Sequence, residues 1–228
     1  MNGYFQSILE GAWLTVTVSL ASLGVSVLLG LLGAWAKLSA LRAWRWSAMV
    51  YTTVIRGVPD LVLMLLIYYG GTMGLNALIE AAGSDAFIDI NPWWAGVLTI
   101  GFIYGAYMTE TFRGAWLAVP KGQIEAAWAM GMSPWQTFAR IVWPQLMRYA
   151  LPGLTNNWLV LIKTTALVSL IGLHEMTYKA KQASAATREP FMYLLFAGAL
   201  FLLMTSVSLW GIRRLEKRFN RGVVPGLS

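Results

Sequence analysis

Long stretches without a charged residue are the feature that most limits what this chain can fold into. They run over Gly11–Ala36, Leu61–Ile79, Ile90–Thr109 and Pro190–Ile212. An α-helix rises about 1.5 Å per residue, so roughly 20 apolar residues cross the hydrocarbon core of a bilayer. Each stretch is therefore long enough to form a transmembrane helix.

A further segment, "YALPGLTNNWLVLIKTTALVSLIGL" at 149–173, is apolar overall but carries amide and amino groups. The composition agrees with a membrane protein, because 57% of the residues are hydrophobic and only 12% are charged, against about a quarter charged in soluble domains. We predict an all-α polytopic membrane helix bundle, with one transmembrane permease-like domain over residues 1–228. Its five predicted spans lie at about residues 11–36, 60–80, 92–110, 149–173 and 190–212. Since no Lys or Arg precedes the first span, we expect it to stay in the protein rather than be cleaved as a signal peptide.

The positions of the basic residues predict the orientation, because loops on the cytoplasmic side are enriched in Lys and Arg. No basic residue precedes the first span, and the second and third spans are joined by a segment that holds Glu80, Asp85 and Asp89. We therefore predict an outside N-terminus and an inside C-terminus. The basic residues assigned to the cytoplasmic side are Lys37, Arg42, Arg45, Arg56, Arg113, Lys121, Arg140, Arg148, Arg213, Arg214, Lys217, Arg218 and Arg221. Lys179, Lys181 and Arg188 are the exception, since five spans assign them to the outside.

The sequence offers little for catalysis. It has no cysteine, and its single histidine, His174, has only Glu175 beside it, so neither a metal site nor a catalytic triad is expected. We predict no catalytic residue, no metal and no cofactor in this chain. The basic C-terminal tail is interpreted as a topology anchor beside the inner leaflet, and not as a nucleic-acid site.

The predicted cytoplasmic loop 119–144 has the pattern helix, break, helix. Pro120 suits a first helical turn, Ile124, Ala127 and Trp128 share one face, and Gly131 suits the left-handed residue that ends many helices. A second helix is then predicted with Ser133 as its N-cap and Pro134 at its first position. Its apolar stripe is Trp135, Phe138, Ile141 and Val142, and Pro144 would turn the chain into the next span. Taken alone, this loop could also be an amphipathic pair lying flat on lipid.

The spacing of Glu125, Ala126, Ala127, Gly131, Ile141 and Pro144 resembles the EAA loop of ABC importer permeases. One departure is Trp143, where that family usually has Leu. Three further segments resemble the polar amino acid branch, and most closely the Q-type subunits of histidine/lysine/arginine/ornithine importers: "VIRGVPDLVLMLLIYYG" at 54–70, "FIYGAYMTETFRGAW" at 102–116 and "NNWLVLIKTTALVSLIGL" at 156–173. Arginine-specific and opine importers share much of this pattern.

The resemblance implies a permease subunit of an ATP-driven importer of polar, and in particular basic, amino acids in the bacterial inner membrane. It implies as partners a related second permease subunit, a dimer of ATPase subunits that bind ATP and Mg²⁺, and an external substrate-binding protein. This chain itself has no G-x-x-x-x-G-K-[ST] loop. The loop 119–144 would couple to the ATPase through Glu125, Gly131 and the aromatic residues Trp128, Trp135 and Phe138. A secondary transporter is the rival hypothesis, but it would not need such a docking loop and would usually have repeated halves, which we do not find here.

Polar residues inside the spans are candidates for the substrate path. A charge in the bilayer centre costs about 2.5 to 3.5 kcal/mol on insertion scales, so Lys163 should face a partner or a wet cavity. The candidates are Asn156, Asn157, Lys163, Thr164 and Ser169 on one helix, with Asp60 and Glu110 as acids that could neutralise the lysine. Asn156, Lys163 and Ser169 are expected roughly on one side. Alternatively, Asn157, Thr164 and Thr165 bond neighbouring helices, and the acids cap helices or line an interface.

Pairs of glycines four residues apart occur twice within the spans, at Gly70 with Gly74 and at Gly101 with Gly105. Small residues at this spacing allow two helices to approach closely. We expect both pairs to serve packing within the chain.

Overall fold

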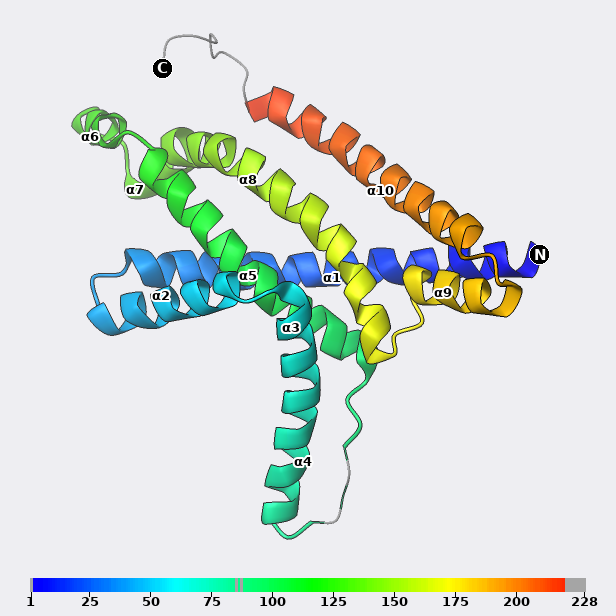
Figure 1. The fold of residues 1–228 in the computed structure, drawn as a ribbon. Helices are drawn as coiled ribbons and strands as arrows, with labels where there is room; N and C mark the ends of the chain where they lie inside the picture. The colour runs from blue at the N-terminus through cyan, green and yellow to red at the C-terminus, as the bar shows by residue number, and fades with distance from the viewer. Residues whose placement is uncertain (1, 85, 87, 220–228) are drawn as a thin grey trace.

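The computed structural model describes residues 2–84, 86 and 88–219, and all regular elements of that part are helices (Figure 1). Asp85 and Arg221, which the orientation argument used, lie outside the described residues. The all-helical prediction is therefore confirmed for the part of the chain that the structure describes.

The first helix, α1, covers Asn2–Leu38 and is followed by α2, Arg42–Gly57. α2 folds back and packs against both α1 and α5 through Ala48, Thr52 and Ile55, which are buried at helical spacing. Its opposite face is exposed. The sequence interpretation had treated this segment only as a charged connection and missed the helix.

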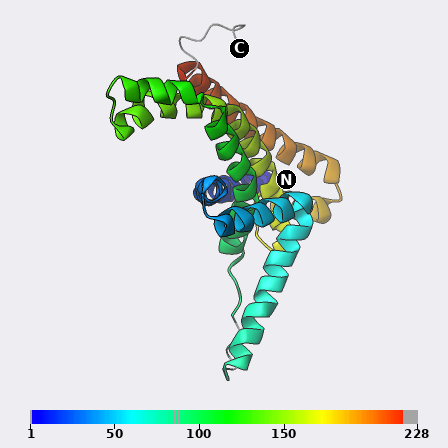
Figure 2. The same cartoon turned by 90° about the vertical axis from the view of Figure 1, so that its left-hand side faces the viewer.

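A rod formed by α3 (Asp60–Leu65), the π-helical turn η1 (Leu66–Gly70) and α4 (Gly71–Ala81) stands away from the other helices in two views (Figures 1 and 2). Pro59 precedes the rod in an extended conformation, which separates it from α2. Asn76 of α4 binds the segment that follows the rod. Its side chain accepts from the Ile88 N–H at 2.8 Å and donates to the Ile88 carbonyl at 3.0 Å.

The centre of the fold is α5, Pro92–Ala118, which begins at the N-cap Asn91 and packs along α1. Its residues Ile100, Ile103 and Tyr104 belong to the largest buried cluster. Close packing depends on two of its glycines, since a Cβ at Gly101 would lie 2.5 Å from a Val25 methyl group and one at Gly105 would lie 2.8 Å from Leu29 Cβ.

This finding confirms the expected packing role of Gly101 and Gly105. By contrast, a Cβ at Gly70 or Gly74 would have no described atom within 4 Å. The expected packing role within the chain is therefore wrong for Gly70 and Gly74, as far as the described residues show.

After α5, the loop forms α6 (Lys121–Ala129) and then one unbroken helical run: α7 (Pro134–Thr137), the π-helical turn η2 (Phe138–Val142), α8 (Trp143–Thr164) and the 3₁₀ segment η3 (Thr165–Ile171). The prediction that the second helix of the loop ends at Pro144 is wrong, because the helical run continues through this residue without a break. Pro144 is the second residue after the wide π-helical turn, where its missing N–H and its ring are accommodated.

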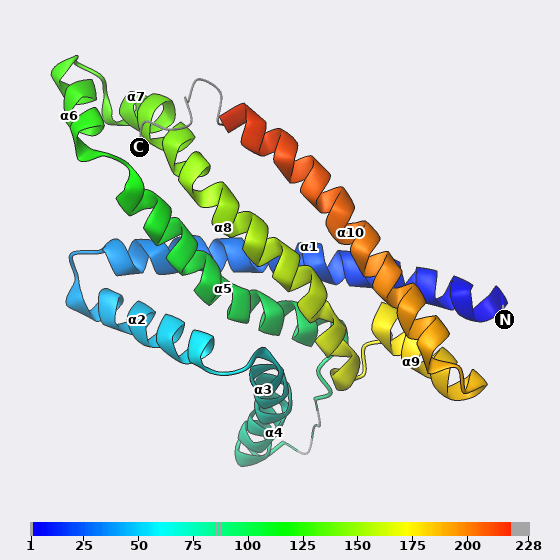
Figure 3. The same ribbon diagram turned by 45° about the horizontal axis from the view of Figure 1, so that its top comes forward.

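The last two helices are α9 (Met176–Thr187) and α10 (Pro190–Phe219). α9 packs on α1, and α10 runs beside α8 and contacts α9 (Figure 3). A second buried cluster joins Ile8, Met176 and Tyr193, so the N-terminal part of α1 is held by α9 and α10.

Four helical stretches in the described part are long and apolar enough to cross a membrane: Gly3–Leu38, Asp60–Ala81, Pro134–Ile171 and Pro190–Lys217. They contain three of the predicted spans and all but the last two residues of a fourth, 149–173. The remaining prediction, 92–110, falls on α5, which is not among the four; its less apolar glycines, threonines and tyrosines are largely buried against neighbouring helices. The number of five spans and their direction stay predictions.

Candidate functional site

The turn between α6 and α7 is built by two capping motifs in succession. Gly131 has a φ of +77°, and the N–H groups of Gly131 and Met132 donate to the carbonyls of Trp128 (2.9 Å) and Ala127 (3.0 Å). This pattern is a Schellman motif, which requires a left-handed residue where glycine stands. The predicted role of Gly131 as the stop of the first helix is confirmed.

The next helix begins with a capping box. Ser133 Oγ accepts from the Gln136 N–H at 3.3 Å, while the Gln136 side chain accepts from the Ser133 N–H at 2.9 Å. Pro134 occupies the first helical turn. Both the Ser133 cap and the position of Pro134 were predicted, whereas Pro120 lies one residue before α6 and not within its first turn.

The loop exposes large apolar side chains at the end of the molecule. Trp135 is 73% exposed, Met130 is 84% exposed and Trp128 is 58% exposed, whereas Ala127 is buried. Glu125, Ala126 and Ser133 are exposed, and Phe138, Ile141 and Pro144 are partly buried. The helical spacing predicted that Trp128 shares one face with Ala127. This prediction is wrong, because Ala127 is buried and Trp128 is exposed.

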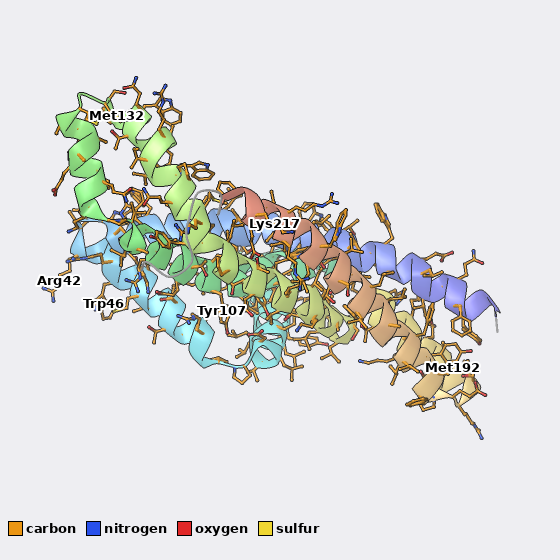
Figure 4. The ribbon with its side chains drawn as sticks, turned by 90° about the horizontal axis from the view of Figure 1, so that it is seen from above. Arg42, Trp46, Tyr107, Met132, Met192 and Lys217 are labelled. Atoms are coloured by element: carbon orange, nitrogen blue, oxygen red, sulfur yellow. The ribbon has the colours of Figure 1, made fainter. Side chains whose placement is uncertain are left out.

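An aromatic row and a hydrogen bond connect this exposed loop to the helical run that follows it. Trp135, Phe138 and Trp143 form an aromatic row with ring centroids 6.0 Å and 6.2 Å apart. Gln145 of α8 donates to Gln123 of α6 at 2.6 Å. These contacts connect the tip, marked by Met132 in Figure 4, to the long helix that continues as α8.

A polar crossing joins α3, α5 and α8 near the middle of the fold. The Tyr104 hydroxyl donates to Asp60 Oδ2 at 3.2 Å and lies 2.6 Å from the Thr164 hydroxyl. Tyr107 stacks on Tyr104 with ring centroids 5.5 Å apart, and the Arg56 guanidinium lies 5.4 Å from the Tyr107 ring centroid. Among the described residues, no basic group lies within 4 Å of the Asp60 carboxylate.

The other predicted acid lies elsewhere. Glu110 pairs with Lys37 of α1 through one oxygen and with Arg113 Nε at 3.0 Å through the other. It borders a polar cavity of about 420 Å³ that is also lined by Thr52, Thr53, Arg56 and Tyr107. Neither Glu110 nor Asp60 pairs with Lys163, so the expected neutralisation of that lysine is wrong: the acids lie on α3 and α5 and are engaged by nearer groups.

The polar residues of α8 and η3 separate into two sets. Asn157 is buried and donates to the Thr111 hydroxyl at 3.0 Å, and Thr164 is buried at the polar crossing, so both join neighbouring helices. Asn156 and Lys163 share the exposed face of α8. Ser169 does not join them in an open path, because α9 packs on η3 and Lys181 donates to the Ser169 hydroxyl at 3.3 Å.

Sequence reasoning missed Tyr104, Tyr107 and Arg56, which complete the polar surroundings of Asp60. A signal was present, since tyrosines at i and i+3 in an apolar segment place two hydroxyls on one helical face. It also missed Glu175, a fully buried N-cap of α9 that accepts from the N–H groups of Thr177 (2.9 Å) and Tyr178 (2.8 Å) and from the Thr15 hydroxyl (3.1 Å).

An apolar helical bundle with a capped, exposed loop between α5 and α8 is the arrangement expected for the permease class of ABC importers. Residues 26–221 match the family model described as "Binding-protein-dependent transport system inner membrane component". The chain belongs to this family.

Relatives and a solved structure narrow the class. The chain is 52% identical to the histidine/lysine/arginine/ornithine transport system permease protein HisQ of Salmonella typhimurium, over 98% of this chain and 97% of that one. It is 40% identical to the octopine transport system permease protein OccQ of Rhizobium radiobacter, over 99% and 95%. A crystal structure of an amino acid ABC transporter with histidines matches with a TM-score of 0.80 and 30% identity, covering 96% of both chains.

These findings establish the resemblance that the loop spacing indicated. The chain is a multi-pass membrane permease of an ABC-type amino acid importer. In this class, the permease forms the translocation pore, ATP hydrolysis lies in a separate subunit, and a binding protein delivers the substrate.

Proposed function

We propose that this permease imports basic amino acids and that Asp60 binds their side-chain cation. The observation that carries the proposal is the carboxylate at the polar crossing, which is half-buried and has no basic partner among the described residues. An acid inside a membrane protein is costly unless it pairs with a cation or faces water. A transported guanidinium or ammonium group would supply that cation.

The surroundings of Asp60 favour a cation of this kind. Tyr104 donates to one oxygen of the carboxylate, and stacked Tyr104 and Tyr107 offer ring faces beside it. Such faces attract guanidinium and ammonium groups. Arg56, which lies over Tyr107, would compete with the substrate or bind its carboxylate. The names of the 52% identical relative, which transports histidine, lysine, arginine and ornithine, support the same substrate class.

We infer five spans with the N-terminus outside, so that the loop 119–144 lies on the cytoplasmic side. In this orientation, Trp128, Met130 and Trp135 would dock into a groove of an ATPase subunit, since exposed aromatic anchors of this kind dominate interfaces. Glu125 is exposed beside them for an ion pair. ATP and Mg²⁺ would be bound by a pair of such subunits, and not by this chain.

The exposed rod α3–η1–α4 and the exposed face of α8 would meet a second, related permease subunit. The rod buries few of its residues within the chain, and Asn156 and Lys163 are exposed on α8. In the pair, these two residues would line the path of the substrate. The assembly would lie in the inner membrane of a bacterium and receive its amino acid from a periplasmic binding protein.

Uptake of labelled amino acids tests the role of Asp60. The complete importer, with its binding protein, is reconstituted in proteoliposomes as native protein and as Asp60→Asn. We expect the variant to lose at least about thirtyfold in apparent affinity for arginine, since removing one partner of a desolvated charge pair costs roughly 2 to 5 kcal/mol. Asn156→Ala is the control for a polar residue of the path that carries no charge.

Arginine uptake by Asp60→Asn with unchanged apparent affinity would contradict the cation site. Uptake of a neutral amino acid such as glutamine in preference to arginine and lysine by the native importer would contradict the substrate class. Octopine is measured in parallel, because a 40% identical relative is named for it.

A further inference from the structure

A basic cavity lies where α1 ends, α2 begins and α5 ends, apart from the polar crossing and from the loop. Its volume is about 410 Å³. Four cationic residues line it together with an acid and two apolar side chains: Lys37, Arg42, Arg45, Arg113, Glu110, Trp46 and Met49. Four cations against one carboxylate leave a surplus of three positive charges.

The single carboxylate does not neutralise the arginines of α2. Both oxygens of Glu110 are already engaged, by Lys37 and by Arg113. Arg42 and Arg45 are exposed, and neither has an acidic partner within 4 Å in the described part of the chain. Two guanidinium groups therefore remain available for an anion.

An apolar groove adjoins the basic cavity at Trp46. It has a volume of about 670 Å³ and runs along α2 as far as Phe102 of α5, with Val50, Val54 and Tyr51 also in its lining. Tyr51 donates to the Phe102 carbonyl at 2.6 Å and closes the groove at its base. Trp46 lines both the cavity and the groove, so the two adjoin at this side chain. Figure 4 shows Arg42 and Trp46 together at the outer edge of α2.

The tryptophans of this region fit the depth of lipid headgroups. Trp35 and Trp44 lie with ring centroids 5.9 Å apart, and Trp46 is 66% exposed. Tryptophan is enriched at the boundary between hydrocarbon and water, where an indole places its ring in lipid and its N–H in the polar layer. The side chains that join the cavity and the groove are therefore of the type found at that boundary.

We propose that α1, α2 and α5 form a binding site for an anionic glycerophospholipid, with its phosphate in the basic cavity and an acyl chain in the apolar groove. Basic pockets between membrane helices bind anionic lipid headgroups in this way. A zwitterionic lipid would leave the positive surplus uncompensated, and a free phosphate would make no use of the groove. With the proposed orientation, the lipid belongs to the inner leaflet.

Native mass spectrometry of the complete importer measures the lipid directly. The importer is taken from nanodiscs of phosphatidylcholine that contain increasing amounts of phosphatidylglycerol, and retained lipid is counted per copy of this chain. We expect one phosphatidylglycerol to be retained. In Arg42→Gln/Arg45→Gln, its affinity should fall about thirtyfold, because each basic residue near an anionic lipid surface contributes about 1 kcal/mol.

Arg213→Gln/Arg214→Gln is the matched control. It removes the same charge from the same proposed leaflet but lies on α10, away from the cavity, and Arg214 contacts the Trp210 ring instead. We expect this variant to retain the lipid. An equal loss of phosphatidylglycerol in both double variants would indicate a general attraction to the basic surface and would overturn the site. Equal retention of phosphatidylcholine, or no loss of lipid in either variant, would overturn it as well.

Two further arms distinguish a lipid from other occupants. Val54→Trp fills the groove at a position that is 51% exposed, so the fold is kept while the acyl chain is displaced; we expect weaker retention of phosphatidylglycerol. Displacement of the lipid by glycerol 3-phosphate at equal concentration would overturn the role of the groove. Absence of retained lipid from the native importer would overturn the proposal.

Discussion

Gly131 provides a sharp test of how the loop couples to its partner. Its φ of +77° is left-handed, and a Cβ added there would have no described atom within 4 Å. Any effect of an alanine within this chain must therefore come from the backbone. For an L-residue, the left-handed conformation costs roughly 1 to 2 kcal/mol, which corresponds to about a five- to thirtyfold smaller population of the observed turn.

Three substitutions separate the backbone from the side chain. Gly131→Ala should lower binding-protein-stimulated arginine uptake and ATP hydrolysis several-fold in proteoliposomes, because the Schellman turn that aims Trp128 and Trp135 is less populated. Gly131→Asn should lose less, since asparagine tolerates the left-handed region. Gly122→Ala, within α6 and equally open, is the matched control and should be neutral.

The ranking of the variants decides between two explanations. Native activity in Gly131→Ala would refute the need for a left-handed residue. An asparagine variant that is worse than the alanine variant would also refute the backbone argument, because it would assign the role of Gly131 to close approach of the ATPase.

Ser133→Ala removes the capping box and should cost about 1 kcal/mol, seen as weaker coupling of ATP hydrolysis to the binding protein with unchanged basal hydrolysis. Gly11→Ala would place a Cβ 2.9 Å from the backbone of Glu175 and Met176, so thermal unfolding should begin several degrees lower, whereas Gly24→Ala, with no described atom within 4 Å, should match the native protein. Burial raises the pKa of Glu175 against the opposing hydrogen bonds from Thr177, Tyr178 and Thr15. The folded protein therefore keeps the Glu175 carboxyl protonated to a higher pH than the unfolded chain, in which the pKa of this group is 4.5. The contribution of Glu175 to the free energy of unfolding should decline as the pH rises above about 4.5. Glu175→Gln should flatten that decline in pH-dependent unfolding, and an unchanged slope would contradict it.

Local signals in the sequence predicted the loop well. Gly131, Ser133 and Pro134 act through backbone conformation and hydrogen bonds within a few residues, and the structure confirms all three roles. The effect of Pro144 on the helix was predicted wrongly, because it depends on the π-helical turn before it. The residue pattern does not predict that turn.

Contacts between distant segments could not be predicted in the same way. Lys163 and Glu110 were expected to interact because each carries a charge within or at the end of a span. The pairing of Glu110 with Lys37 depends on how α1 crosses α5, which is set by the close packing at Gly101 and Gly105. α2 is different, since the spacing of Ala48, Thr52 and Ile55 is that of an amphipathic helix and could have been recognised.

We propose that the importer containing this chain takes up basic amino acids with energy from ATP on the side of the loop 119–144. The most direct measurement is uptake of labelled arginine into proteoliposomes that hold the complete importer, with the binding protein outside and ATP either inside or outside. We predict uptake with ATP on the loop side only, and its loss in Glu125→Lys. Uptake driven by an ion gradient without nucleotide would contradict this account.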